Sequence, residues 1–356
     1  MSSKRILIMN RGEIASRIAK ACRELEHISV GVWTENEVHA RHLEFCDEWV
    51  FLPGKNNQET YLNIKNILQI IQENEIDAVH PGYGFLSENA EFIEALEKNG
   101  TIFIGPHSDA VKKMGDKAIA KTLAEKNGIP VVPGSVGEVA TIEEALKIAA
   151  QIEFPVLLKA VAGGGGRGLR PCFNEQELRN NFDAVGREAT SSFGNGALLV
   201  EKFIENPRHI EVQILSDKKG NTYHFFEREC SIQRRHQKII EEAPSPFIGE
   251  DEALRQNICE TAVNLAKAVN YDSAGTVEFI VGDDRKFFFL EMNTRIQVEH
   301  PITEEITGID LIVCMIQSAF GDDLGIPSQD WIRRTGHAIE CRICAEDPIT
   351  MLPAPG

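Results

Sequence analysis

The chain contains 356 residues, of which 42% are hydrophobic and 26% are charged, and its formal net charge is −17 at pH 7. A chain of this length usually forms more than one hydrophobic core, so two or three domains are expected. Such an acidic chain is ill suited to tracking the phosphates of a nucleic acid. No apolar run is long enough for a membrane span or a signal peptide, and the eight scattered cysteines are typical of a reducing compartment. These features predict a cytoplasmic protein that contacts neither nucleic acid nor membrane.

Strands and helices alternate through the first hundred residues. Residues 4–9 read as a strand, and residues 14–25 then carry an apolar stripe at helical spacing. Further strands are predicted over residues 29–33, 77–80 and 101–104. The pattern predicts a mostly parallel, Rossmann-like sheet. The first strand-to-helix turn, NRGEI, lacks the dinucleotide-binding fingerprint.

A smaller module follows up to about residue 205, and the chain is strand-rich after it. A helix is predicted over residues 116–127, because Gly128 and Pro130 form a stop signal. The later part has a predicted helix over 251–269 and predicted strands over 209–215, 222–227, 276–281 and 287–292.

The stretch LLKAVAGGGGRGLR, residues 157–170, contains a G-x-G-x-x-G match. No helix follows it, since residues 169–173 look extended and Asn174 is the next good N-cap, so a dinucleotide site is not indicated. A glycine loop between two strands can instead cover phosphates, with Lys159 adding a charge at its base. From the glycines alone, a surface loop without a ligand is equally compatible.

Two carboxylates are predicted to share one face of a hairpin. With Asp283 and Asp284 at the centre of its turn, Glu278 lies opposite Phe289, and Glu291 is its diagonal neighbour on the same face. Carboxylates so close together repel unless a cation joins them, and oxygen ligands suit Mg²⁺. The predicted ligands are Glu278, Glu291 and Asn293. Two solvated glutamates at a sheet edge are the alternative.

Two further groups of residues attract attention. Residues 229–238 concentrate basic side chains beside Gln233, a mixture that suits phosphate or a small anion, although a solvated charge run is the usual explanation. Cys341 and Cys344 form a C-x-x-C pair in a predicted strand. A structural zinc site needs more ligands than this pair supplies, so both are expected to be ordinary buried cysteines.

Nine motifs together resemble the biotin carboxylase family, the ATP-grasp component of acetyl-CoA, propionyl-CoA and pyruvate carboxylases. They are NRGEIASRI at 10, HPGYGFLSEN at 80, FIGP at 103, MGDKAIAK at 114, GGGGRG at 163, HIEVQ at 209, ERECSIQRRHQK at 227, EMNTRIQVEHPITE at 291 and GHAIECRICAED at 336. The resemblance implies α/β and α+β architecture in three parts. These are a Rossmann-like N-terminal domain over 1–114, an ATP-grasp domain over 115–325 with a glycine-rich lid at about 131–204, and the incomplete start of a C-terminal domain over 326–356.

The resemblance also implies a reaction. ATP would phosphorylate bicarbonate to carboxyphosphate, whose CO₂ passes to the ureido nitrogen of biotin on a carrier domain or chain. The implied cofactors are ATP, Mg²⁺ or Mn²⁺, and biotin. The implied partners are a biotin carboxyl carrier, a carboxyltransferase component and, in the full-length protein, a second copy of the chain.

Site residues follow from the resemblance, motif by motif. Those implied for ATP are Lys117, Lys159, Gly165, Gly166, Glu201, Lys202, Ile204, His209, Gln233, His236, Glu278 and Glu291. Glu278, Glu291 and Asn293 would hold the metal, and Lys238, Arg295, Gln297 and Val298 would bind bicarbonate. Glu299 would be the general base that deprotonates bicarbonate, because bicarbonate is a weak nucleophile, and Arg342 would stabilise the enolate of biotin.

Some features depart from the family pattern. Ala162 and Leu169 replace a usual glycine and methionine, and Pro171 follows the loop, which raises the question of how freely the lid closes. Relatives usually continue past Gly356, and the chain has no Met-Lys-Met biotin attachment site. Another ATP-grasp carboxylate ligase and an inactive nucleotide-binding fragment or partner subunit are the alternatives. The final acceptor stays open among acetyl-CoA, propionyl-CoA, another acyl-CoA and pyruvate.

Overall fold

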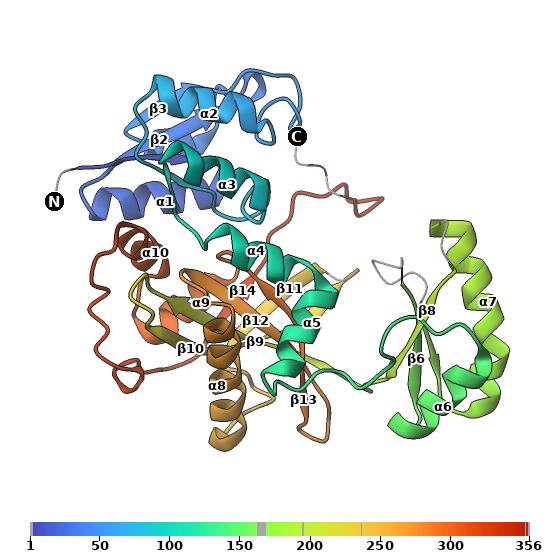
Figure 1. The fold of residues 1–356 in the computed structure, drawn as a ribbon. Coiled ribbons are helices and arrows are strands. Elements are labelled where there is room, and N and C mark those ends of the chain that lie inside the picture. The colour runs from blue at the N-terminus through green and yellow to red at the C-terminus, as the bar shows by residue number, and fades with distance from the viewer. Residues whose placement is uncertain (1–2, 162–168, 194–195, 236, 353, 355–356) are drawn as a thin grey trace.

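The computed structural model describes residues 3–161, 169–193, 196–235, 237–352 and 354. Three sheets organise them: a parallel sheet of five strands, a sheet of six strands and a sheet of three strands. Figure 1 shows the three units, with the five-stranded one above the six-stranded one and the three-stranded one standing to the side. Among the described residues, no helix combines the length and apolar character needed to cross a bilayer.

The first sheet has the order β3-β2-β1-β4-β5, and all of its pairings are parallel. Its strands are β1 (Arg5–Ile8), β2 (Ile28–Trp33), β3 (Glu48–Phe51), β4 (Ala78–His80) and β5 (Ile102–Phe103), and its helices are α1 (Gly12–Glu24), α2 (Ile64–Glu73) and α3 (Ala90–Asn99). Short 3₁₀ helices span Glu35–Glu37 and Arg41–Phe45. The predicted parallel, Rossmann-like sheet is confirmed, and the strand β3 is an element that the sequence did not reveal.

Side chains of β1 alternate between the two faces of this sheet. Ile6 and Ile8 pack into a core that contains residues of α1 and of α10 (Leu311–Phe320), and Leu7 and Met9 pack into a core that contains residues of α2 and α3. The first of these cores also includes residues of the six-stranded sheet, so the two units share apolar packing.

Two helices lead from the first unit to the rest of the chain. They are α4 (Ser108–Gly115) and α5 (Lys117–Lys126). Asp116 caps α5 by accepting from the backbone N–H groups of Ala118 and Ile119 at 2.9 and 3.0 Å. The helix predicted over 116–127 is therefore confirmed.

The side unit carries the glycine stretch. Its antiparallel sheet has the order β7-β6-β8, and its elements are α6 (Ile142–Ile152), β6 (Val156–Ala160), β7 (Leu169–Cys172), α7 (Glu175–Phe193) and β8 (Leu198–Lys202). A hydrophobic core of its own holds it together. Asn174 caps α7 by accepting from the N–H of Glu177 at 3.0 Å, as predicted. Strands β6 and β7 flank the glycine stretch, as predicted, but Gly165, Gly166 and Ala162 lie outside the described residues.

The largest sheet has the order β13-β12-β9-β10-β11-β14 and is antiparallel throughout. Its strands are β9 (Arg208–Ser216), β10 (Thr222–Arg234), β11 (Gln237–Ala243), β12 (Ala274–Val281), β13 (Phe287–Asn293) and β14 (Ala338–Cys341). The remaining helices are α8 (Glu252–Ala268), α9 (His300–Thr307), α10 (Leu311–Phe320) and the 3₁₀ helix Gln329–Trp331. On one face, Ile210, Val212 and Ile214 pack into a core with α8. Their neighbours His209, Glu211 and Gln213 alternate with them and therefore face the other side.

The structure corrects the predicted register of the carboxylate hairpin. Glu278 lies directly opposite Glu291 rather than opposite Phe289, which pairs with Phe279. The turn holds one residue more than expected, because Arg285 adopts a left-handed conformation with φ 63° and closes a three-residue loop. A register shift between Glu278 and Phe279 leaves Leu290 as an extra residue on β13.

The expectation for the C-x-x-C pair is also wrong. Cys341 and Cys344 are both exposed, whereas the other six cysteines are buried. Cys341 ends β14, which pairs with β11 and forms an edge of the sheet, so its side chain has strand packing on one side only.

Candidate active site

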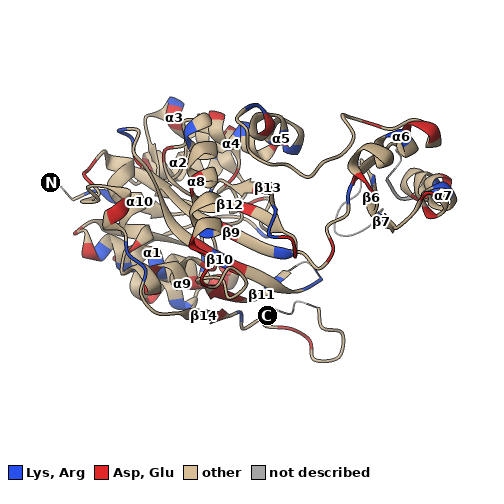
Figure 2. Ribbon diagram, turned by 90° about the horizontal axis from the view of Figure 1, so that it is seen from below, with Lys and Arg blue, Asp and Glu red and all other residues tan. Residues whose placement is uncertain are grey.

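Lys238 is the cation around which the site is built. It lies on β11, and its Nζ contacts the carboxylates of Glu211 from β9, Glu278 from β12 at 2.8 Å and Glu299 from the turn before α9 at 2.8 Å. All three glutamates are at most 4% exposed. Buried carboxylates this close together are tolerated only when cations pair with them. Figure 2 shows acidic residues gathered near β10 and α9.

Arg228 is a second, fully buried cation in the same cluster. It lies on β10, and its Nε donates to Glu211 at 2.6 Å. Its two Nη groups donate to Gln213 at 2.8 Å, Gln297 at 2.6 Å and Thr303 at 3.0 Å. This arginine therefore ties β9 and β10 to the turn before α9 and to α9 itself.

The pKa values follow from these contacts. Burial alone would raise the pKa of Glu278, but the hydrogen bond from His209 and the charge of Lys238 outweigh it and lower this pKa well below its ordinary value. Burial alone would lower the pKa of Lys238, but Glu211, Glu278 and Glu299 raise it well above its usual value. Glu278 and Lys238 are therefore both ionised at neutral pH.

Arg342 joins Glu299 to the edge of the sheet. It directly follows β14, and its Nη2 donates to Oε2 of Glu299 at 2.9 Å. Its Nε donates to Glu241 on β11 at 2.6 Å. Both oxygens of Glu299 are thus engaged, one by Lys238 and the other by Arg342.

A second series of hydrogen bonds leads from Glu278 toward the first unit. Oε1 of Glu278 accepts from Asn293 and from Gln297, each at 2.8 Å. Arg295 donates to Oδ1 of Asn293 at 2.8 Å and to Glu88 at 2.9 Å. Because Glu88 lies just before α3, the first unit contributes a residue to the surroundings of this site.

Histidine and glutamine side chains border the cluster on its other side. Nε2 of His209 lies 2.8 Å from Oε2 of Glu278, and Nδ1 of His209 lies 3.3 Å from Nε2 of Gln233. Burial opposes a charged imidazole, but Glu278 outweighs it and raises the pKa of His209. Val298 is half-buried in the turn between β13 and α9. His236 lies outside the described residues.

A cavity of about 310 Å³ adjoins these residues. Lys117 and Glu291 line it and lie 3.6 Å apart, and Asn293 and Glu88 also line it. Its walls come from α4, α5 and β13, so it opens where the first unit, the connecting helices and the large sheet meet.

The remaining predicted residues lie on the side unit or just after it. Lys159 on β6 and Lys121 on α5 approach Glu201 on β8 at 3.5 and 3.3 Å. Nζ of Lys202 donates to the carbonyl oxygens of residues 153 and 154 at 3.0 and 3.2 Å. Ile204 lies beside the β12–β13 turn, against Gly282. These residues are separate from the Lys238 cluster.

Sequence reasoning missed the charged residues Glu88, Glu211, Arg228 and Glu241 of the site. One signal for Glu211 was present: in HIEVQ, polar residues alternate with Ile and Val, which places His209, Glu211 and Gln213 on one face of a strand. That this polar face is buried was not evident, because residues from several distant strands cover it.

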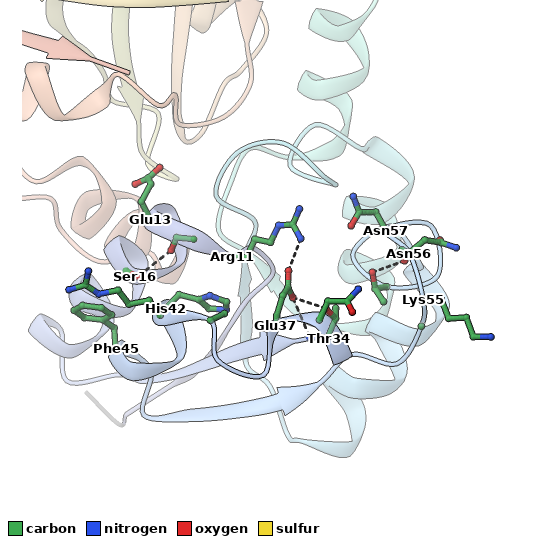
Figure 3. Close-up of a pocket in the computed structure, with 16 residues that line it drawn as sticks. Arg11, Glu13, Ser16, Thr34, Glu37, His42, Phe45, Lys55, Asn56 and Asn57 are labelled. Atoms are coloured by element: carbon green, nitrogen blue, oxygen red, sulfur yellow. Dashed lines mark hydrogen bonds and ion pairs between the residues drawn. The ribbon is translucent and has the colours of Figure 1, made fainter. Parts of the chain in front are cut away.

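The first unit has a cavity of its own, of about 780 Å³ (Figure 3). Arg11, Lys55 and Asn56 line it, together with Glu37. Arg11 is already paired with Glu37 at 2.6 Å, and none of the predicted site residues lines this cavity.

Comparisons with known proteins place two family models on the chain. The biotin carboxylase N-terminal domain matches residues 2–111, and the ATP-binding domain of the carbamoyl-phosphate synthase L chain matches residues 116–326. A biotin carboxylase of Halalkalibacterium halodurans is 49% identical over 99% of this chain and 77% of its own length. The propionyl-CoA carboxylase alpha chain of Ruegeria pomeroyi is 50% identical over 97% of this chain and half of its own length.

A solved structure shows the same fold. It is the biotin carboxylase domain dimer of 2-oxoglutarate carboxylase from Hydrogenobacter thermophilus, in complex with MgADP, ADP and bicarbonate. The match has a TM-score of 0.85 and 49% identity and covers 98% of this chain and 77% of that one.

Proposed function

The chain belongs to the biotin carboxylase family, and from this premise we propose that it carboxylates biotin with bicarbonate at the expense of ATP. This is the first half-reaction of a biotin-dependent carboxylase. The observation that carries the proposal is the half-buried Lys238 between Glu278 and Glu299, with Arg342 on the second oxygen of Glu299. This arrangement sets a carboxylate base between two fixed cations.

Lys238, Arg295, Gln297 and Val298 form the proposed bicarbonate pocket. Glu299 is the proposed base within it, because a carboxylate held between Lys238 and Arg342 has a fixed direction toward an anion bound at those same cations. When bicarbonate accepts hydrogen bonds from Lys238 and Arg342 in place of Glu299, one oxygen of Glu299 becomes free to accept the proton of bicarbonate.

Those residues proposed for ATP that the structure describes lie in more than one part of the molecule. Lys117 and Glu291 line the 310 Å³ cavity, and Lys159 and Glu201 face each other on the side unit. The other residues proposed for ATP are Gly165, Gly166, Lys202, Ile204, His209, Gln233, His236 and Glu278. The glycines would let backbone N–H groups approach the phosphates closely.

Glu278, Glu291 and Asn293 are the proposed holders of Mg²⁺ or Mn²⁺. They fit such an ion because their oxygens are hard ligands and because Glu278 and Glu291 are directly paired on neighbouring strands. Once bound, the ion would supply positive charge to the phosphate oxygens. Of these residues, Glu291 and Asn293 line the cavity.

Arg342 is proposed to contact the ureido oxygen of biotin, which needs a fixed positive donor. Biotin is proposed to arrive on a carrier domain or chain, and a carboxyltransferase component would consume the carboxylated product. We also propose a homodimer, a cytoplasmic location, and domain boundaries at 1–114, 115–325 with a lid at about 131–204, and 326–356. The homodimer is supported by the relative that was solved as a dimer, and the domain boundaries are supported by the ranges of the two family models.

The test is a measurement of ATP cleavage with and without bicarbonate and free biotin. The proposal predicts cleavage that requires bicarbonate and that biotin stimulates. Bicarbonate-dependent cleavage indifferent to biotin would instead indicate another ATP-grasp ligase. Binding of Mg-ATP without any cleavage would indicate an inactive nucleotide-binding subunit.

A further inference from the structure

We propose that Glu241 and Glu340 share one proton and, through it, act as positioning residues for Arg342. This inference deepens the proposed function and rests on it for the role of Arg342. The proton-sharing itself is a property of the two strands that can be measured without any substrate.

The two glutamates face each other across a strand pair. Strands β11 and β14 are antiparallel, and Glu241 is directly opposite Glu340. Directly opposite residues point to the same face of a sheet, with Cβ atoms about 4.5–5.5 Å apart. Two carboxylates in this relation are unfavourable if both are ionised.

Each glutamate has one oxygen that lacks a partner. Oε2 of Glu241 and Oε2 of Glu340 are buried and accept no hydrogen bond from the described residues. The other oxygen of Glu241 accepts from Nε of Arg342 at 2.6 Å. An unpaired buried acceptor is costly, and a single proton between the two carboxyl groups would satisfy both oxygens at once.

The charges around Glu340 favour this proton. Burial raises the pKa of Glu340 to about 7, and Glu241 from β11 and Glu299 from the start of α9 act in the same direction. Arg342 and Arg228 act against it. Burial likewise raises the pKa of Glu241, against the charge of Arg342.

The proton has a consequence for Arg342. With it in place, the pair carries one negative charge, and Glu241 is fixed with one oxygen on Nε of Arg342. The opposite end of the guanidinium then points at Glu299. When the proton is lost, the two carboxylates repel each other and the support of Arg342 loosens. The protonated form of the glutamate pair is therefore the one that orients Arg342. The fraction of molecules in this form falls as the pH rises through about 7.

The experiment compares three variants of the full chain. Glu340→Gln keeps a hydrogen-bond donor for Glu241 but cannot titrate, and Glu340→Ala removes the partner. Glu242→Gln is the matched control, because Glu242 is the next residue on β11 and pairs with His337 at 3.0 Å instead. The first measurement is the infrared carbonyl band of a protonated carboxyl group at pH 6, taken as a difference spectrum between the wild type and each variant.

The second measurement is kcat/KM for free biotin and KM for ATP between pH 6.5 and 8.5. We expect Glu340→Ala to lower kcat/KM for biotin about tenfold with KM for ATP unchanged, and Glu340→Gln to restore most of it. The ratio of wild type to Glu340→Gln should fall severalfold as the pH rises, because only the wild type loses its proton.

The outcomes distinguish a failure of the shared proton from a failure of the proposed biotin carboxylation. A carbonyl band that disappears in Glu340→Gln and stays in Glu242→Gln supports the shared proton even if the enzyme does not use biotin. If the band is the same in the wild type and Glu340→Gln, the inference is overturned whatever the activity. A wild-type to Glu340→Gln ratio that is independent of pH would overturn the positioning role alone.

Discussion

At the scale of single residues, Glu299 is the group on which the proposed chemistry depends most. It is 2% exposed, and Lys238 and Arg342 hold its two oxygens at 2.8 and 2.9 Å. We expect Glu299→Gln to keep ATP binding and to lose about a hundredfold or more in bicarbonate-dependent ATP cleavage, because an amide cannot accept the proton. Steady-state rates with and without bicarbonate measure this.

The matched control for Glu299 is Glu305→Gln, since Glu305 is an exposed residue of α9. It should cleave ATP like the wild type. Unchanged cleavage in Glu299→Gln would remove this residue from the role of base, and equal loss in both variants would indicate a general effect on α9.

Lys238 is expected to matter for bicarbonate more than for ATP. Its ammonium group is enclosed by the carboxylates of Glu211, Glu278 and Glu299, so a neutral amide there leaves the pocket strongly negative toward an incoming anion. Lys238→Gln should therefore raise KM for bicarbonate at least tenfold while changing KM for ATP much less.

The control for this change is Lys219→Gln, which alters an exposed lysine 3.8 Å from Asp323. Titrations of ATP and of bicarbonate with both variants measure the two KM values that this prediction compares. If Lys238→Gln weakened the two substrates equally, the residue would have no special place in the bicarbonate pocket.

At the scale of elements, the sequence predicted secondary structure better than register. The carboxylate pair was found on the right two strands, but Glu278 was placed opposite Phe289. The error has a local cause, since sequence alone does not show that Arg285 takes a left-handed conformation or that Leu290 is left over on β13. Motif matching located Lys238, Glu299 and Arg342, which the structure does bring together.

Other members of the cluster depend on contacts between strands that are far apart in the chain. Arg228 and Thr276 are 48 residues apart, and Arg342 and Glu241 are 101 residues apart. A charged residue in a strand is normally read as solvent-facing, and only the sheet order shows that these are enclosed. Strand β11, which supplies both Lys238 and Glu241, was itself not predicted.

Arg228 is expected to hold the strands of the large sheet together. It is fully buried and pairs with Glu211. Arg228→Met should lower the free energy of unfolding by about 3–5 kcal/mol, because the buried negative charge of Glu211 then loses its pairing with the arginine. Urea unfolding measures this difference.

Arg5→Met is the control for this prediction, since Arg5 makes a comparably short contact of 2.8 Å with the exposed Glu48. That pair should contribute no more than about 1 kcal/mol. Similar losses in the two variants would contradict the structural role given to Arg228.

At the scale of the whole molecule, the site lies where separately built units meet. Arg17 of α1 pairs with Glu304 at 3.0 Å and Asp310 at 2.7 Å, which fastens the first unit to the α9–α10 segment. The same units share one apolar core, whereas the side unit has its own. The net charge of the chain is −17, so the proposed binding of an anion depends on the local cations that the assembled units bring together and not on overall composition.

Buried and half-buried histidines in different units should make the stability of the whole molecule fall in mild acid. Burial lowers the pKa of His80 to about 3 and that of His224 and His300 to about 4. Between pH 6.5 and about 4, the unfolded chain therefore binds protons at these residues that the folded chain does not. The free energy of unfolding should decrease as the pH falls through this window, by about 1.4 kcal/mol per pH unit for each such histidine.

His224→Gln tests this expectation away from the proposed active site. It removes one of the three histidines, so the dependence of the free energy of unfolding on pH between 6.5 and 4.5 should become shallower by about one proton. The raised pKa of Glu340 acts in the opposite direction, because its contribution to stability is present below its unfolded pKa and is lost as the pH rises through about 7. In the double variant His224→Gln, Glu340→Gln the two changes should therefore partly cancel between pH 5 and 6.5, and an unchanged slope in His224→Gln alone would show that this histidine is not held neutral by the fold.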